Sequence, residues 1–394
     1  MLERRSFGEL PAKAHTALRG SDHALRYEEC ITRAGFDGPY SIVYHEGRPH
    51  EAEPVALPHG WRVPVRAVAP SLQRRHLKSF EQRPRGGAPL DARVPLLEND
   101  ELVLSVLTPD RDDPAYFVNA DSDELLFIRE GGGQLQTQLG ALRFRANDYL
   151  CLPRGLLHRF LLDAGLSQDW LVIESAGAIA IPRQYRNESG QLRMDAPYSH
   201  RDFRAPEFGG PHDEGLRDLV VKRGGAFHGF RYAHSPLDVV GWDGTYYPVA
   251  FSILDFQAKV GMVHLPPTVH ATFALPGALV CSFVPRPLDY HPAAVACPYP
   301  HSSVDIEEVI YYVRGEFSSR TGISPGSISV HPSGIPHGPH PGAYESSLGA
   351  SYTDELAVML DCARPLHLTD AAFALDDPGY HHSFVDPGGS HSIG

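Results

Sequence analysis

Short hydrophobic runs separated by turn residues occupy most of the chain. Residues 134–139 alternate between polar and apolar side chains, as expected of a strand with one buried face. Compact apolar runs at residues 124–131 and 149–152 end at a glycine and before a proline, respectively. Glycine (37) and proline (35) are abundant, and long alanine- and leucine-rich stretches are few. The pattern predicts an all-β-dominated fold with few short helices.

Two segments carry the same series of residues at similar spacing. In each, an acidic cluster precedes an apolar run, and a glycine follows the last acid, Glu124 or Glu308, by seven residues. A Pro-x-Gly-x-x-His motif then ends at His158 in the first segment and at His337 in the second. The distance from acid to histidine is 34 residues in the first and 29 in the second, as one loop of different length would produce. This repeat predicts a duplicated β-barrel or jelly roll.

The 394 residues are enough for two domains. We expect residues 1–235 to form an N-terminal β domain with a degenerate barrel, and residues 236–394 to form a C-terminal barrel. The polar stretch from about residue 180 to 235 is interpreted as a surface connection, in which residues 215–222 suit a helix or a strand equally. The arginine-containing stretch at residues 72–87 is interpreted as a solvated loop.

The second segment offers two histidines and one carboxylate, His301, Glu308 and His337, in an order suited to one metal site. Two imidazoles and one carboxylate leave open positions on an octahedral ion, which is typical of Fe(II) in oxygen-using enzymes. The same donors also suit Mn(II), Ni(II) or Zn(II). Glu307 precedes Glu308 and would point to the opposite face of a strand. The repeat favours Glu308 as the ligand, and residues 236–394 are therefore expected to carry the metal site.

The first segment lacks a histidine at the position that corresponds to His301. Asn119 and Asp121 are near that position instead. We therefore interpret the first copy as a decayed site, in which Glu124 and His158 remain as polar residues of a structural barrel.

If the substrate of such an oxygen-using site is a phenol, a neighbouring group must accept its hydroxyl proton, and histidine titrates near neutral pH. His264 and His270 flank a Pro-Pro pair and are the candidates. From the residues alone, either one could instead be a buried, hydrogen-bonded histidine.

The net charge of −13 disfavours nucleic-acid binding, because no basic stripe is available to neutralise phosphates. No apolar run is long enough to span a bilayer, so no membrane partner is expected. The five cysteines are scattered and odd in number, which indicates free thiols in a reducing compartment. We expect a cytoplasmic protein.

The C-terminal half resembles the homogentisate 1,2-dioxygenase family of ring-cleaving cupin enzymes. The resemblance covers residues 230–390 well and the N-terminal half more loosely. It is carried by DVVGWDGTYYP (residues 238–248), HLPPTV (264–269), PYPH (298–301), EVIYYVRG (308–315), PHGP (336–339) and ESSL (345–348).

The resemblance implies a duplicated cupin barrel (a bicupin) with Fe(II) as cofactor, held by His301, Glu308 and His337, and with His264 as the base. It implies that homogentisate, a small aromatic substrate, reacts with O2 to give maleylacetoacetate in tyrosine and phenylalanine breakdown. It also implies a homo-oligomer, a trimer or a dimer of trimers. No residue that binds the substrate is identified in advance.

Three departures from the family pattern bear on the substrate. The first histidine is one residue farther from the glutamate than in the family, Phe317 stands where the family has a tyrosine that contacts substrate, and the N-terminal half is shorter. A related hydroquinone- or gentisate-type ring is therefore the alternative substrate. An alternative of another class is a metal-binding bicupin without oxygenase activity, such as an isomerase or a binding protein.

Overall fold

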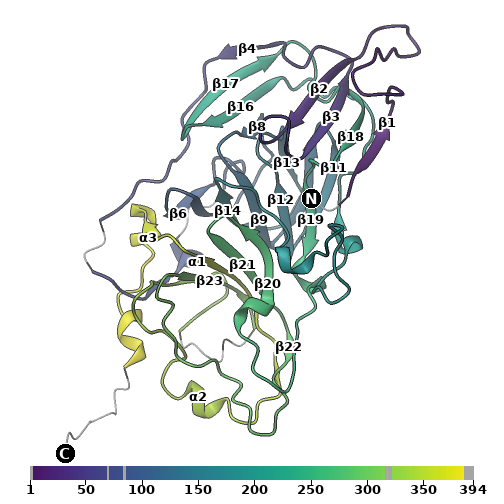
Figure 1. The fold of residues 1–394 in the computed structure, drawn as a ribbon. Coiled ribbons are helices and arrows are strands. Elements are labelled where there is room, and N and C mark those ends of the chain that lie inside the picture. Colours follow the sequence, from purple (N-terminus) through teal and green to yellow (C-terminus); the bar gives the residue numbers. More distant parts are fainter. Residues whose placement is uncertain (1–2, 69–70, 83–85, 316, 318–321, 386–394) are drawn as a thin grey trace, which may run out of the picture.

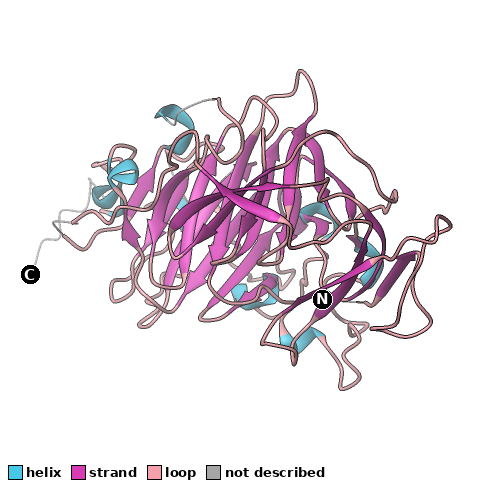
Figure 2. Cartoon of the chain, turned by 90° about the horizontal axis from the view of Figure 1, so that it is seen from above, coloured by secondary structure: helices cyan, strands magenta, loops and turns pink. Residues whose placement is uncertain are grey.

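The computed structural model describes residues 3–68, 71–82, 86–315, 317 and 322–385. Strands fill the interior and short helices lie at the periphery (Figure 2). The α-helices are single four-residue turns: α1 (Ser79–Gln82), α2 (Ala343–Ser346) and α3 (Asp370–Phe373). The 3₁₀ turns are η1 (Arg183–Tyr185), η2 (His200–Asp202), η3 (Ile253–Asp255), η4 (Pro267–His270) and η5 (Tyr380–Phe384). The prediction of a β-dominated cupin-type fold with few short helices is confirmed.

Two large sheets enclose the core of the first barrel. One has the order β11 (Gly140–Arg145), β10 (Gly132–Thr137), β13 (His158–Leu162), β8 (Tyr116–Asn119), β16 (Asp218–Arg223), β17 (Ala226–Tyr232) and β4 (Ala52–Val55). The other has the order β15 (Phe203–Arg204), β19 (Val249–Ser252), β12 (Asp148–Leu152), β9 (Asp123–Glu130), β14 (Asp169–Ser175), β7 (Leu102–Leu107), β6 (Val94–Glu98) and β27 (His367–Leu368). Buried side chains from both sheets, among them Leu135, Leu150, Phe160 and Trp170, pack together between them.

The second unit is built on a six-stranded sheet. Its order is β20 (Ala271–Leu275), β21 (Ala278–Phe283), β26 (Leu356–Cys362), β23 (Glu307–Arg314), β24 (Ile328–His331) and β5 (Arg75–Leu77). Because side chains alternate along a strand, Val309, Tyr311 and Val313 of β23 share one face. That face packs against the first barrel's β9 and β14 in the largest hydrophobic core of the molecule. The opposite face, which carries Glu308, is left for the site.

Smaller sheets complete the fold. At the N-terminal end, β1 (Arg5–Gly8), β18 (Val239–Gly244), β3 (Tyr40–His45) and β2 (Tyr27–Thr32) form a four-stranded sheet. Near the other end of the molecule, β22 (Arg286–Pro287) pairs with β25 (Tyr352–Thr353). This four-stranded sheet lies in the upper part of Figure 1, whereas β20, β21, β22 and β23 lie in its lower part.

Strand pairing crosses the expected division at residues 235 and 236. β18 and β19 follow this position in the chain, yet they pair with β3 and β12 of the N-terminal half. In exchange, β5 pairs with β24, and β27 pairs with β6. Each half of the chain therefore contributes strands to the sheets of the other.

Two local interpretations are corrected by the structure. Within the stretch at residues 72–87, the described part is not a solvated loop, because all three residues of β5 are buried at the edge of the second sheet; residues 83–85 lie outside the described residues. The surface connection at residues 180–235 contains the β16–β17 hairpin, which extends a sheet of the first barrel. Of the two possibilities left open for residues 215–222, the strand is the one formed, as β16. No helix in the described part of the chain is long and apolar enough to cross a membrane.

Candidate metal centre

Strand alternation separates the two adjacent glutamates of β23. Glu307 points away from the site and accepts the backbone N–H of Leu366 at 2.7 Å. Burial raises the pKa of Glu307. Glu308 points to the other face, where it lies opposite His331 of β24 and Asp361 of β26. The alternation therefore places Glu308, and not Glu307, in the candidate site.

The two predicted histidines reach Glu308 from loops that pair with each other. The backbone N–H of His301 donates to the carbonyl of His337 at 2.8 Å, and the N–H of His337 donates back at 2.8 Å. Their rings lie 4.3 Å apart. One ligand-type atom from each of His301, Glu308 and His337 lies within 4.8 Å of the others. The structure thus brings the three sequence-predicted ligands into one cluster.

The polar atoms of this cluster fit a bound cation. His337 is 3% exposed, and neither of its ring nitrogens has a hydrogen-bond partner. A buried, unsatisfied imidazole is unfavourable, and a metal ion would supply the missing partner. His301 holds its Nδ1 3.2 Å from the carbonyl oxygen of Tyr299, which leaves Nε2 for an ion. The cluster thus offers two nitrogens and a carboxylate to an ion.

His331 is a site residue that the sequence analysis missed. It is fully buried, and its Nδ1 lies 2.6 Å from Glu308 Oε1. Its ring stacks on that of His337 at 4.7 Å. Burial would favour the neutral acid, but the hydrogen bond from His331 and the nearby imidazole of His337, whose Nε2 lies 3.6 Å from Glu308 Oε1, hold the pKa of Glu308 well below its usual value. A signal was present in the repeat, because Leu152 pairs with Glu124 where His331 pairs with Glu308.

His264 lies near the cluster but outside it. Its side chain is 46% exposed, and its Nδ1 is 3.4 Å from Asp289 Oδ2. Its ring packs at 5.0 Å against Tyr299, whose ring lies 6.2 Å from that of His301. The structure places Tyr299 in contact with both rings, and the assignment of His264 as the base stays a prediction.

His270, the other candidate base, has a different environment. It is buried, with its ring 5.0 Å from that of Phe283. Burial, assisted by the charge of Arg286, lowers its pKa to about 3. His270 is therefore a neutral histidine of the protein interior.

Phe317, singled out by the sequence analysis, and the C-terminal Tyr380 also have a defined place. Phe317 is buried, with its ring 4.7 Å from that of Tyr312. Tyr380 folds back onto the site, and its hydroxyl lies 3.1 Å from His331 Nε2. His382 is exposed.

The corresponding position of the first barrel is occupied by a salt-bridge cluster. Arg93 Nη1 lies 2.6 Å from Glu124 and 3.1 Å from Glu174, and Asn119 donates to both carboxylates. Lys222 also pairs with Glu174. His158 turns its Nδ1 to the carbonyl of Leu156 at 2.9 Å. An arginine side chain here supplies the positive charge beside the acid.

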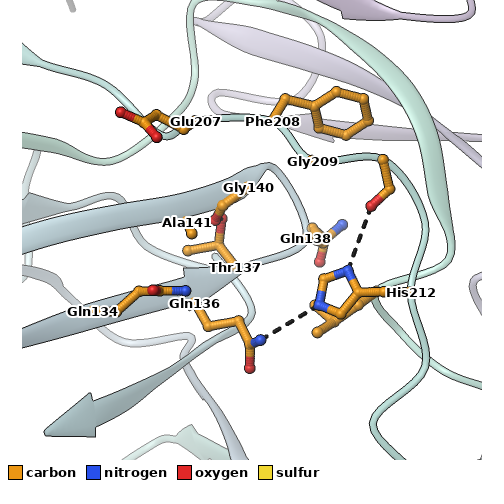
Figure 3. Close-up of a pocket in the computed structure, with 12 residues that line it drawn as sticks. Gln134, Gln136, Thr137, Gln138, Gly140, Ala141, Glu207, Phe208, Gly209 and His212 are labelled. Atoms are coloured by element: carbon orange, nitrogen blue, oxygen red, sulfur yellow. Dashed lines mark hydrogen bonds between the residues drawn. The ribbon is translucent and has the colours of Figure 1, made fainter.

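A separate small cavity lies on the outside of the first barrel (Figure 3). Its volume is about 100 Å³, and its lining includes Gln134, Gln136, Gln138 and His212. Gln136 Nε2 lies 3.4 Å from the ring of His212. None of the three clustered ligands lines this cavity.

Comparison with known proteins places the chain in a family. A protein of Saccharolobus solfataricus, provisionally named as a dioxygenase, is 36% identical over 95% of this chain and 96% of its own length. The family profile described as "Homogentisate 1,2-dioxygenase N-terminal" matches residues 103–253. The chain belongs to the homogentisate 1,2-dioxygenase family. The homogentisate 1,2-dioxygenase of Nitrobacter hamburgensis is 28% identical over 66% of this chain. The match spans only 60% of that dioxygenase.

Two solved structures are similar over much of the chain. Protein Ylba from E. coli has a TM-score of 0.34 and 11% identity, covering 74% of this chain and 91% of its own. A cupin 2 conserved barrel domain protein from Leptotrichia buccalis has a TM-score of 0.33 and 8% identity, covering 76% of this chain and 100% of its own. Both scores are low.

Proposed function

We propose that the protein is an Fe(II)-dependent ring-cleaving dioxygenase that converts homogentisate and O2 to maleylacetoacetate. The observation that carries this proposal is the cluster of His301, Glu308 and His337 within 4.8 Å, in a chain of the homogentisate 1,2-dioxygenase family. Both oxygen atoms of O2 are incorporated in the product, so no external reductant is needed.

The three clustered side chains have the role of ligands. Together they would occupy one face of the ion and leave its other positions for substrate and O2. Bound Fe(II) would supply the redox chemistry that lets O2 react with an electron-rich ring. Glu308 offsets part of the charge of the ion, and His331 orients the carboxylate through its 2.6 Å hydrogen bond.

His264 has the role of base in this proposal. Its Nδ1 faces the carboxylate of Asp289, so Nε2 is the atom available to accept a phenolic proton. The neighbouring carboxylate stabilises the imidazolium that forms. Replacing His264 with alanine is expected to lower turnover, and full activity of that variant would exclude His264 as the base.

The direct test is oxygen uptake. Protein loaded anaerobically with Fe(II) is mixed with homogentisate in an oxygen electrode cell, and the near-ultraviolet absorbance of the product is followed in parallel. The His337→Ala variant, which removes one ligand, is the control. Uptake by the wild type and none by the control is expected, whereas no uptake and no product from the wild type would exclude homogentisate.

The alternative substrate is a related hydroquinone or gentisate-type ring, which Phe317 favours because it lacks the hydroxyl of the family's tyrosine. A panel of substituted dihydroxybenzenes separates the two possibilities by kcat/KM. The alternative of another class, a metal-binding bicupin without oxygenase activity, requires Zn(II) or Mn(II) in the purified protein and no oxygen uptake. Elemental analysis distinguishes it.

The assembly and the cellular location stay predictions. A trimer or a dimer of trimers is expected in solution, and light scattering coupled to size-exclusion chromatography measures it. A cytoplasmic location is expected from the reduced cysteines, all five of which are free thiols.

A further inference from the structure

The C-terminal turn η5 packs beside the candidate metal centre. Tyr380, its first residue, is 4% exposed, and its ring lies 5.5 Å from that of His76. Asp377, just before the turn, anchors it to the β5 segment. Its carboxylate forms an ion pair with Lys78 at 3.0 Å, and its backbone N–H donates to the carbonyl of His76 at 2.8 Å. β5 in turn pairs with β24, which ends at His331. Tyr380 is therefore held in place by the same sheet that carries the site.

A continuous series of hydrogen bonds joins this tyrosine to the clustered carboxylate. Glu308 Oε1 lies 2.6 Å from His331 Nδ1, and His331 Nε2 lies 3.1 Å from the hydroxyl of Tyr380. With Glu308 ionised, His331 Nδ1–H donates to the carboxylate, and Nε2 accepts the hydroxyl proton of Tyr380. The rings of His331 and Tyr380 are nearly parallel, at 17° and 6.3 Å. The tyrosine thus selects one tautomer and one orientation of the imidazole.

We propose that Tyr380 is a positioning residue of the metal centre, acting on Glu308 through His331. This inference rests on the proposed metal site and deepens it. A carboxylate on a metal must present its oxygen in a narrow range of directions, and groups that hydrogen-bond to such ligands commonly change metal affinity when they are replaced. Without the hydroxyl, the ring of His331 can rotate or change tautomer, and Glu308 can turn away from the position between His301 and His337.

The first barrel lacks the hydrogen-bonded series of acid, histidine and tyrosine. There, Leu152 stands at the position of His331, and the acid Glu124 is held by Arg93 and Asn119 instead. An acid that pairs with a fixed guanidinium needs no imidazole to orient it. The hydrogen-bonded series from Glu308 through His331 to Tyr380 occurs at the barrel that would hold an ion.

The experiment uses Co(II) as a probe and requires no turnover. Co(II) is titrated into the metal-free, full-length protein, its visible absorption bands are recorded, and its affinity is measured by competition with a chelator. Tyr380→Phe is expected to weaken Co(II) binding by roughly three- to tenfold and to shift the visible bands; His331→Leu is expected to weaken it by roughly 10- to 100-fold. Adding Tyr380→Phe to His331→Leu should cause no further loss, because the tyrosine acts through the imidazole.

Tyr149→Phe is the matched control. Its hydroxyl is also fully buried and lies 2.9 Å from Ser282 Oγ in the core between the two barrels. This variant removes one hydrogen bond in the same way, and its Co(II) affinity and spectrum should equal those of the wild type.

The outcomes separate the inference from the proposed function. If the wild type shows no visible Co(II) bands, or if these bands persist in the His337→Ala variant, the metal site itself is excluded. If the wild type binds Co(II) and Tyr380→Phe binds it with the same affinity and spectrum, the positioning role is excluded. If Tyr380→Phe lowers the Co(II) affinity by the same factor in the wild-type and His331→Leu backgrounds, the inference is also overturned, because the tyrosine would then act by another route.

Discussion

The two barrels place acids at the same strand positions and balance their charge differently. Glu124 of β9 lies opposite Glu174 of β14, just as Glu308 of β23 lies opposite Asp361 of β26. In the first barrel, the buried guanidinium of Arg93 contacts both acids. In the second, no lysine or arginine in the described part of the chain pairs with either acid, and Glu308 is contacted by His331 and His337 instead.

The pKa values follow this difference. Burial opposes the charge of Glu124, but Arg93, with help from His158 and Asn119, lowers its pKa. Burial raises the pKa of Asp361 to about 7, and the charge of Glu308 adds to the effect. One barrel therefore contains its own cation, whereas in the other the proposed metal ion would supply the positive charge.

The largest expected effect contrasts the two equivalent glutamates. Glu308→Gln removes a ligand, so bound iron and oxygen uptake should fall by more than about 100-fold, beyond the loss typical of outer residues. The Glu124→Gln variant should keep the iron of the second barrel, because Arg93 already supplies the positive charge beside residue 124. This variant should, however, unfold at a lower temperature than the wild type. Elemental analysis measures the bound iron, an oxygen electrode measures oxygen uptake, and thermal unfolding gives the unfolding temperature. Loss of iron from Glu124→Gln would break the comparison.

The next effect concerns the internal cation. Arg93→Met leaves Glu124 and Glu174 buried without their main partner, which should lower the free energy of unfolding by about 3–5 kcal/mol. Arg143→Met is the control, because Arg143 pairs with Asp163 at the surface, and its loss should cost at most about 1 kcal/mol. Denaturant unfolding of the metal-free protein measures both. Similar values for the two variants would show that the buried cluster is not a stabilising device.

A pH dependence of stability is expected from the N-terminal half. Burial opposes the charge of His45, but hydrogen bonds to Asp238 and Glu29 outweigh it and raise the pKa to about 9. Because the folded-state pKa lies above the unfolded value of about 6.5, the stabilisation is complete below pH 6.5 and is lost as the pH rises through 9. The slope is at most about 1.4 kcal/mol per pH unit.

Urea unfolding of the metal-free protein between pH 6 and 10 tests this expectation. His45→Gln should flatten the dependence in that range. An unchanged slope in the variant would assign the pH dependence to other groups.

The smallest effect concerns substrate choice at the second barrel. Phe317→Tyr introduces a hydroxyl, and one hydrogen bond to a ring substituent changes the ratio of kcat/KM values by about two- to tenfold. The preference for homogentisate over unsubstituted hydroquinone should rise by this factor. An unchanged ratio would remove Phe317 from the residues that determine specificity.

The repeat in the sequence singled out Glu308 and His337, because both segments share the acid and the Pro-x-Gly-x-x-His motif, whereas His301 has no counterpart in the first segment. Alternation on a strand also separated Glu307 from Glu308. The spacing of residues did not predict His331 as a site residue, because its partner Glu308 is 23 residues away and is reached only across the β23–β24 pair. A single histidine in an apolar run does not reveal such a partner.

The charged stretch at residues 72–87 was predicted to be a solvated loop, but it contains the buried strand β5. Arg75 is buried, and its guanidinium pairs with Asp376, which lies 301 residues farther along the chain. Sequence shows the charge of an arginine but not the distant carboxylate that makes its burial possible. The same contacts bring Tyr380 to His331.

The sequence by itself determined the β-dominated fold and the duplicated barrel, and it predicted His301, Glu308 and His337 as ligands, because these depend on periodicity and on short spacing. Only the tertiary structure decided which strands cross between the halves, which acid Arg93 neutralises, and that His331 and Tyr380 stand behind Glu308. The physical reason is that pairing between distant segments is selected by the burial of whole faces and by matched buried charges, and neither is a property of a single segment.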